Sequence, residues 1–238
     1  RGVAGRLRPT DGSELTEPSR PSLPDLAPAG SAGSGRLPFG VPAPDASLRA
    51  DFFLRPVVEV ARALLGSCLI STVGGQRTVV VVVETEAYGG PDDPASHAAT
   101  RAGVTARNRV MFGPPGRAYV YRSYGVHWCL NVVTGPEGDA QAVLLRGGAP
   151  LLGLDAMRER RSGRTPLAAG PGRLAQALGV SGTLRAHDFS RPPLRIVPGW
   201  SVEEDRVGVS PRIGITSAAD RPHRFYVRGA PGVSGRPR

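Results

Sequence analysis

Acidic side chains crowd the end of an apolar run between Val79 and Tyr88. The segment reads VVVVVETEAY, so Glu84 and Glu86 directly follow five consecutive valines. A carboxylate held at the end of a buried strand can act as a general base, or it can bind a cation together with further acidic ligands. The alternative is a solvated strand end with an exposed tyrosine, and this stretch alone does not decide between the two.

Further acids and a histidine follow shortly after the two glutamates. Asp92, Asp93 and His97 could complete a site for a divalent cation, because carboxylates and imidazole are common metal ligands. Asp92-Asp93-Pro94 fits a polar turn that caps the segment before His97 equally well. We therefore expect no metal and no cofactor, and the metal site stays as the minor alternative.

The positive net charge of the chain is concentrated in residues 47–238. Residues 1–46 carry five arginines and five acidic residues, so the net charge of +10 lies in residues 47–238. A basic folded domain suits an anionic partner, most commonly nucleic acid, although a cationic surface can also serve solubility alone. All 30 basic residues are arginine. Because the chain has no lysine amine, covalent catalysis through a lysine Schiff base is excluded.

Composition divides the chain into two parts. Residues 1–46 are rich in Pro, Gly, Ser and Ala without apolar periodicity, so we expect a disordered tail there and one folded domain over 47–238. The acidic residues of the tail argue against a mitochondrial presequence. No stretch approaches the roughly 20 apolar residues of a membrane span, so a soluble protein is expected. Cys68 and Cys129 lie in apolar contexts, which indicates buried thiols in a reducing cytoplasm.

Short helices and strands alternate in the folded part without a regular βαβ repeat, which favours an α+β fold. Helices are predicted over 52–65, where Pro56 opens the main helix, and over 152–161 and 172–178. Strands are predicted over 68–72, 78–88, 118–123, 126–133, 141–146, 207–215 and 224–228.

Two of these elements orient the candidate side chains. If 78–88 stays extended, its period of two places Glu84, Glu86 and Tyr88 on one face. Strands 118–123 and 126–133 form a tight hairpin with Tyr124 and Gly125 at its tip. The hairpin therefore presents an aromatic side chain at its turn.

Several long motifs occur in a distinctive order from residue 84 to residue 229. They read ETEAYGGPDDPASHA, TARNRVMFGPPGRAYVYRSYGVHWCLNVV, AVLLRGGAPLLGLDAMRERR, AAGPGRLAQALG and PRIGITSAADRPHRFYVRG. This series resembles the alkyladenine DNA glycosylase family, the 3-methyladenine glycosylases of mammalian type that also occur in bacteria. We expect a single mixed α+β domain with a curved, mainly antiparallel sheet, surrounding helices and a protruding hairpin.

The resemblance implies a monofunctional DNA glycosylase of base excision repair. Such an enzyme flips alkylated or deaminated purines out of duplex DNA and hydrolyses the N-glycosidic bond, leaving an abasic site. The expected substrates are 3-methyladenine, 7-methylguanine, hypoxanthine and ethenoadenine, and the expected partner is double-stranded DNA that contains them. We expect a monomer in the bacterial cytoplasm, associated with the nucleoid.

The resemblance also implies roles for individual residues. Glu86 matches the base that activates water, and Arg146 matches the arginine that helps to hold this water and the carboxylate. An unperturbed glutamate has a pKa of about 4.3, so Glu86 is expected to be ionised at neutral pH. The groups that enclose the extruded base are expected to be Tyr88, His97, Tyr121 and Asn131, with Asn131 acting against the amino group of guanine.

Tyr124 matches the tyrosine that enters the minor groove where the base has left. Arg107 and Arg109, in TARNR, match a basic loop expected beside DNA. Two other classes stay open from the residues alone. A non-catalytic nucleic-acid-binding module would need the hairpin and the arginines but not Glu86, and a metal-dependent nuclease would need the acids together with a cation.

Overall fold

The valine-rich segment forms a long buried strand with the bounds that the sequence predicts, β2 (Thr78–Tyr88). Its valines, residues 79–83, have no exposed surface. A strand that is apolar on both faces is typical of a sheet that is covered on both sides. β2 therefore runs through the core and has the buried Glu84 and Glu86 near one end.

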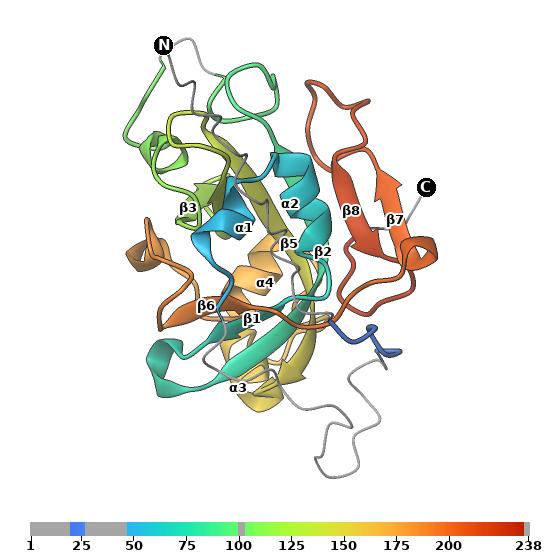
Figure 1. Cartoon of the computed structure of the whole chain (residues 1–238). Coiled ribbons are helices and arrows are strands. Elements are labelled where there is room, and N and C mark those ends of the chain that lie inside the picture. The colour runs from blue at the N-terminus through green and yellow to red at the C-terminus, as the bar shows by residue number, and fades with distance from the viewer. Residues whose placement is uncertain (1–19, 27–46, 100–102, 236–238) are drawn as a thin grey trace, which may run out of the picture.

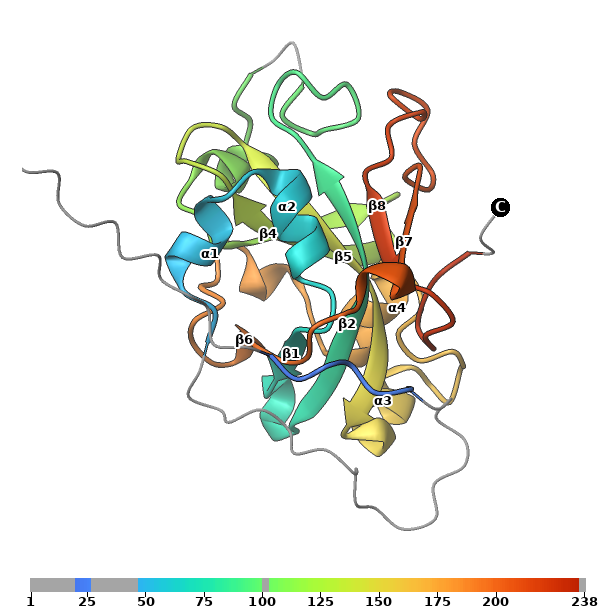
Figure 2. The same cartoon turned by 45° about the vertical axis from the view of Figure 1, so that its right-hand side comes forward.

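The computed structural model describes residues 20–26, 47–99 and 103–235. Helices and strands are arranged as Figures 1 and 2 show. The helices are α1 (Ala50–Leu54), α2 (Val57–Ala63), α3 (Leu154–Arg160) and α4 (Pro171–Ala177). The strands are β1 (Cys68–Ser71), β2 (Thr78–Tyr88), β3 (Ala118–Ser123), β4 (His127–Thr134), β5 (Gln141–Leu152), β6 (Leu194–Val197), β7 (Val207–Ser210) and β8 (Arg224–Val227).

One sheet joins all of the strands, and every pairing in it is antiparallel. Its main path has the order β3-β4-β5-β2-β1-β6, and β8 pairs with both β2 and β7. The predicted α+β fold with a curved antiparallel sheet is thereby confirmed. β2 is held on both edges near its acidic end, because Glu86 pairs with Leu144 of β5 and with Arg224 of β8. The backbone under Glu86 thus has little freedom to move.

Helices cover the sheet from both sides. α2 packs against β2 and β5, and α4 packs against β4 and β5 on the other side. Thr85 points towards α2, where its Oγ1 donates to Ala61 O at 2.7 Å. Because neighbouring strand residues alternate, Glu84 and Glu86 point to the α4 side. None of the described helices has the length and apolar character that a membrane crossing requires.

Several element bounds differ from the predicted ones. β5 continues past Arg146, where a Cβ atom at Gly147 would lie 2.9 Å from Glu84 Oε2. Glycine there lets the two strands approach closely, so it extends the strand rather than ending it. The predicted strand 207–215 ends at Ser210, because the chain then leaves the sheet to cover Glu86. The short edge strand β6 was not predicted at all.

Residues 20–26 differ from the disordered tail predicted over 1–46. Leu23 is buried, and its N–H donates to Ser201 O at 2.7 Å. The Arg20 guanidinium donates to Ala63 O at 3.2 Å, at the end of α2. This stretch, blue in Figure 2, runs along the folded domain. The other residues of the predicted tail, 1–19 and 27–46, lie outside the described residues.

Candidate active site

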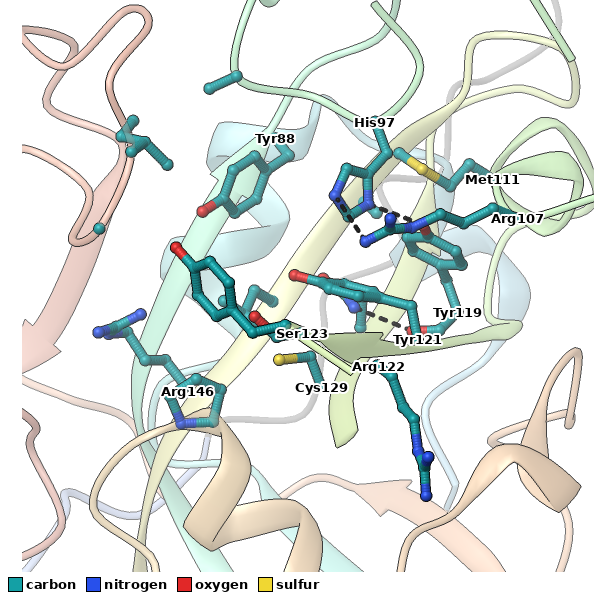
Figure 3. A pocket seen from close by; sticks show the side chains of 18 of the residues that line it. Tyr88, His97, Arg107, Met111, Tyr119, Tyr121, Arg122, Ser123, Cys129 and Arg146 are labelled. Atoms are coloured by element: carbon teal, nitrogen blue, oxygen red, sulfur yellow. Dashed lines mark hydrogen bonds between the residues drawn. The ribbon is translucent and has the colours of Figure 1, made fainter. Parts of the chain in front are cut away.

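A pocket of about 630 Å³ opens where β2, β3, β4 and β5 come together. This volume lies within the usual range for small-molecule sites of about 300–1,000 Å³. Rings and cationic groups dominate its walls, as Figure 3 shows. The lining includes Tyr88, His97, Arg107, Tyr119, Tyr121, Tyr124, Cys129, Asn131, Leu144, Arg146 and Ile213.

Glu86 has no exposed surface and does not itself line this pocket, but its contacts Tyr88, Arg146 and Ile213 do. Its Oε2 accepts a hydrogen bond from the Tyr88 hydroxyl at 2.8 Å. Its Oε1 accepts the backbone N–H of Ile213 at 2.8 Å and lies 3.5 Å from Arg146 Nη1. Of the three side chains predicted to share one face of β2, Glu86 and Tyr88 are therefore in direct contact, and Tyr88 and Arg146 connect Glu86 to the pocket.

The surroundings of Glu86 make it a stronger base than a free glutamate. Burial raises the pKa of Glu86, while the Arg146 charge and the hydrogen bonds from Ile213 and Tyr88 oppose that rise. The pKa is raised on balance, towards the neutral range that suits a general base. Burial likewise raises the pKa of Tyr88, so its hydroxyl keeps the proton that it donates to Glu86.

Arg146 bridges the two glutamates of β2. Its Nη1 faces Glu86 Oε1, and its Nε lies 3.2 Å from Glu84 Oε1. Glu84 is fully buried and also accepts from Arg224 Nε at 2.7 Å. Two guanidinium groups therefore face two buried carboxylates, which offsets the cost of placing these charges away from water.

A buried ion pair holds the loop that supplies Ile213. Arg212 has no exposed side-chain surface, and both of its terminal nitrogens donate to the carboxylate of Asp93. Arg212 also donates to Ala87 O at 2.9 Å and lies over the Tyr88 ring at 4.7 Å. Such a two-point contact fixes direction as well as distance. The loop after β7 is thus attached to the acidic end of β2.

The far wall of the pocket is a cluster of rings around His97. The rings of His97 and Tyr121 meet edge to face at 4.6 Å, and His97 Nδ1 lies 2.8 Å from the Tyr119 hydroxyl. Burial and the nearby Arg107 charge lower the pKa of His97 to about 4. Because Arg107 can only donate, the contact at His97 Nε2 indicates a neutral ring that carries its proton on Nδ1.

Asn131 lies in the same wall, on β4. It is buried, and its Nδ2 donates to Tyr119 O at 2.9 Å. That bond holds the amide in one orientation against the cavity. Cys129, two residues earlier on the strand, is a free thiol that also lines the pocket. Of the expected pocket residues, Tyr88, His97, Tyr121 and Asn131 therefore all reach one cavity.

Tyr124 occupies the tip of the β3–β4 hairpin, as predicted. It is 92 % exposed, and its φ of 50° lies in the left-handed region that non-glycine residues seldom adopt. Gly125 follows with a φ of 69°, and Val126 N donates to Ser123 O at 3.0 Å. A large aromatic side chain held exposed on a strained backbone is a feature associated with function.

The two arginines predicted beside DNA lie in different places. Arg107 points to the pocket, with Nη2 3.4 Å from His97 Nε2 and its guanidinium 5.2 Å from the centre of the Tyr121 ring. Arg109 is exposed and begins a short 3-10 helix, Arg109–Phe112. Arg107 therefore contributes to the pocket wall, a placement that its spacing in TARNR did not indicate.

The residues of the alternative metal site have other partners. Asp93 pairs with Arg212, and His97 contacts Tyr119. Within the described ranges, no group of three acidic, histidine or cysteine side chains could hold a metal ion.

Sequence reasoning missed three contributors to the site. Arg212, Ile213 and Ser234 reach the acidic end of β2 from loops with no periodic pattern. PRIGIT lay within the motifs noted above, but nothing in its spacing indicated a backbone donor to Glu86.

Comparisons with known proteins identify the family of the chain. Residues 51–231 match the family described as Methylpurine-DNA glycosylase (MPG). A protein of Rhodopseudomonas palustris is 50 % identical over 199 residues, which cover 81 % of this chain and 94 % of the relative. One of Frankia casuarinae is 49 % identical over 78 % of this chain and 91 % of the relative. One of Methanoculleus marisnigri is 46 % identical over 80 % of this chain and 100 % of the relative.

Each of these three relatives is provisionally named as a 3-methyladenine DNA glycosylase. The family match extends over most of the chain and includes every site residue predicted from the sequence. The chain therefore belongs to the methylpurine-DNA glycosylase family and is a DNA-repair hydrolase of N-glycosidic bonds.

Proposed function

We propose that Glu86 is the general base of this DNA glycosylase and that Arg146 holds the attacking water and the carboxylate in place. The single observation that carries the proposal is the buried contact of Glu86 with Arg146 and Tyr88, two residues that line the ring-rich pocket. Glycosidic cleavage passes through a cationic, oxocarbenium-like sugar. An ionised Glu86 stabilises that charge and accepts the proton of the attacking water.

The ring cluster supports a pocket for an extruded purine. Flipping a nucleotide out of a duplex costs a few kcal/mol, and stacking on aromatic rings returns about 1–3 kcal/mol per base. Tyr88 and Tyr121 supply stacking faces, and His97 supplies a neutral edge. Tyr124, at the exposed hairpin tip, fills the gap in the base stack and opposes the return of the base.

The substrate range that we propose is 3-methyladenine, 7-methylguanine, hypoxanthine and ethenoadenine. The first two are cationic as N-glycosides and leave without further activation. The two neutral bases need a proton on the leaving group, so their release is slower. Asn131 faces the purine, and its amide would collide with the exocyclic amino group of unmodified guanine.

The product that we propose is an abasic site in an intact strand. Strand cleavage by imine chemistry needs an amine, and no lysine side chain supplies one here. Trapping with borohydride should therefore give no covalent complex with the abasic product. A trapped complex would contradict monofunctional hydrolysis.

A side-by-side assay tests the proposal. Matched duplexes that carry 3-methyladenine, 7-methylguanine, hypoxanthine or ethenoadenine are incubated with excess wild-type enzyme, and free base is measured over time. We expect release from all four, fastest for the cationic bases, and no loss of activity with EDTA. Release of 3-methyladenine alone would overturn the proposed range, and inhibition by EDTA would overturn the metal-free mechanism.

A further inference from the structure

Arg146 is oriented by contacts that lie behind the pocket. Its side chain is only 12 % exposed, and its Nε donates to Ser234 Oγ at 3.0 Å. The same Nε lies 3.2 Å from Glu84 Oε1. The two contacts fix one edge of the guanidinium, and its Nη1 then faces Glu86.

Ser234 uses all of its polar groups in this cluster. Its N–H donates to Glu84 Oε2 at 2.7 Å, and its Oγ donates to Glu84 Oε1 at 3.1 Å. Its carbonyl accepts from Arg224 Nη2 at 2.8 Å. Ser234 is buried, with 8 % of its surface exposed. Ser234 is thus held by four hydrogen bonds to Glu84, Arg146 and Arg224 inside the protein.

The chain near Ser234 is shaped to reach the sheet. Gly232 has a φ of 100°, and a Cβ atom there would lie 2.2 Å from Gly148 O. A Cβ atom at Gly147 would lie 2.2 Å from Gly232 O. Glycine at both positions therefore allows the last described segment to lie directly on β5 beside Arg146. Ser234 lies beyond residues 51–231, the part that matches the family.

We propose that Ser234 and Glu84 are positioning residues for the glycosylase reaction, holding Arg146 so that its Nη1 stays at Glu86. The inference rests on the proposed roles of Glu86 and Arg146. Without the Ser234 hydroxyl, the Arg146 guanidinium turns towards Glu84 and its charge acts less on Glu86.

The consequence is a change in pH dependence. The charged and titratable groups that face Glu86 are Arg146 from β5, Tyr88 and Glu84 from β2, and Cys129 from β4. Among them, Arg146 lowers the pKa of Glu86 against the effect of burial. A weaker Arg146 contact therefore raises the pKa further, and a higher pH is needed to ionise the base. The acid limb of the rate profile then moves to higher pH.

The test is the pH profile of single-turnover base release by Ser234→Ala on a 3-methyladenine duplex. The substitution removes one oxygen and keeps the backbone bonds to Glu84 and Arg224, so the fold is retained. We expect the rate near neutral pH to fall about tenfold, the acid limb to move upward, and the affinity for lesion DNA to stay unchanged. Ser234→Thr, which keeps the hydroxyl, should restore the rate and the profile.

Ser210→Ala is the matched control. Ser210 Oγ accepts from Arg224 Nη1 at 3.0 Å and has no bond to Arg146. Removing this hydroxyl takes one hydrogen bond from Arg224 and none from Arg146. The acid limb of the rate profile should therefore stay in place. If Ser234→Ala is unstable, Ser234→Cys replaces it, because a thiol keeps the shape but hydrogen-bonds weakly.

A wild-type profile for Ser234→Ala would overturn the inference, as would a lower rate with an unmoved acid limb. Glu86→Gln separates this failure from failure of the proposed function. If Glu86→Gln abolishes release while Ser234→Ala behaves like wild type, only the positioning role is wrong. If Glu86→Gln still releases base, the proposed catalytic assignment is wrong.

Discussion

At the acidic end of β2, Glu84 and Glu86 are fully buried among hydrogen bonds, whereas Tyr124 at the hairpin tip is 92 % exposed. The hydrogen bonds of the buried region fix the directions of the Arg146 guanidinium and the Glu86 carboxylate. The exposed tip keeps a strained φ of 50° at Tyr124. In the proposed mechanism, chemistry and DNA contact therefore fall to regions that differ in burial. Substitutions should therefore separate catalysis, stability and DNA contact.

Arg212→Leu should have the largest effect on stability, because it removes one partner of a fully buried ion pair. The free energy of unfolding should fall by about 3–5 kcal/mol, measured by urea denaturation. Arg221→Ala is the control, since Arg221 contacts the same Asp93 at 3.7 Å but is 41 % exposed. Exposed pairs contribute about 0–1 kcal/mol. If both variants lost the same free energy of unfolding, burial would not explain why the Arg212 pair contributes more than the Arg221 pair.

Arg146→Lys tests geometry separately from charge. Lysine keeps one positive charge but cannot contact Glu84 and Glu86 through two separate nitrogens on a planar group. Misplacing a catalytic group by about 1 Å can cost about 100-fold in rate. We expect a loss of that size in single-turnover base release, with unchanged affinity for lesion DNA. A lysine variant as fast as wild type would show that charge alone is sufficient.

Tyr124→Gly should move stability and activity in opposite directions. Glycine adopts a positive φ without steric cost, so the free energy of unfolding should rise by about 1 kcal/mol. Base release should fall about tenfold, because nothing then fills the base stack. Tyr124→Phe keeps the ring and should retain most of the activity. Loss of stability in Tyr124→Gly would contradict the strain assigned to the tip.

Glu86→Gln should have a small, pH-dependent effect on stability. Because burial raises the folded-state pKa of Glu86, the native state favours the protonated form, and ionisation destabilises it as pH rises through that pKa. The neutral glutamine avoids this cost, so the variant should melt above wild type at neutral pH. The difference should shrink as the pH falls towards about 4.3, the unfolded-state pKa. A lower melting temperature at neutral pH would contradict the raised pKa.

Only part of the site follows from short-range patterns in the sequence, and the family resemblance supplied Arg146, His97, Tyr121 and Asn131. Period two placed Glu84, Glu86 and Tyr88 on one face of β2, and the glycine at the hairpin turn placed Tyr124 at its tip. Contacts between residues far apart in the sequence have no comparable local pattern that predicts them. Ser234 reaches Glu84 over 150 residues, and Ile213 reaches Glu86 over 127. Loops of this kind are positioned by close packing against glycines and by buried charges, which no local periodicity encodes.

Burial of the acids was also hidden from the sequence. Charged residues at a strand end usually face solvent, so the change from valine to glutamate indicated an exposed edge as readily as a site. β8 and the loop after β7 cover that edge, and both come from much later in the chain. The raised pKa of Glu86 is therefore a property of the assembled fold.

The most direct test of the account is single-turnover release of 3-methyladenine by Glu86→Gln, measured with its affinity for the same duplex. We predict that the rate falls by about 100- to 10,000-fold while the affinity stays within about threefold of wild type. That result would locate the chemistry at the buried end of β2 and leave DNA contact with the hairpin tip. Release at the wild-type rate, or an equal loss of rate and affinity, would contradict it.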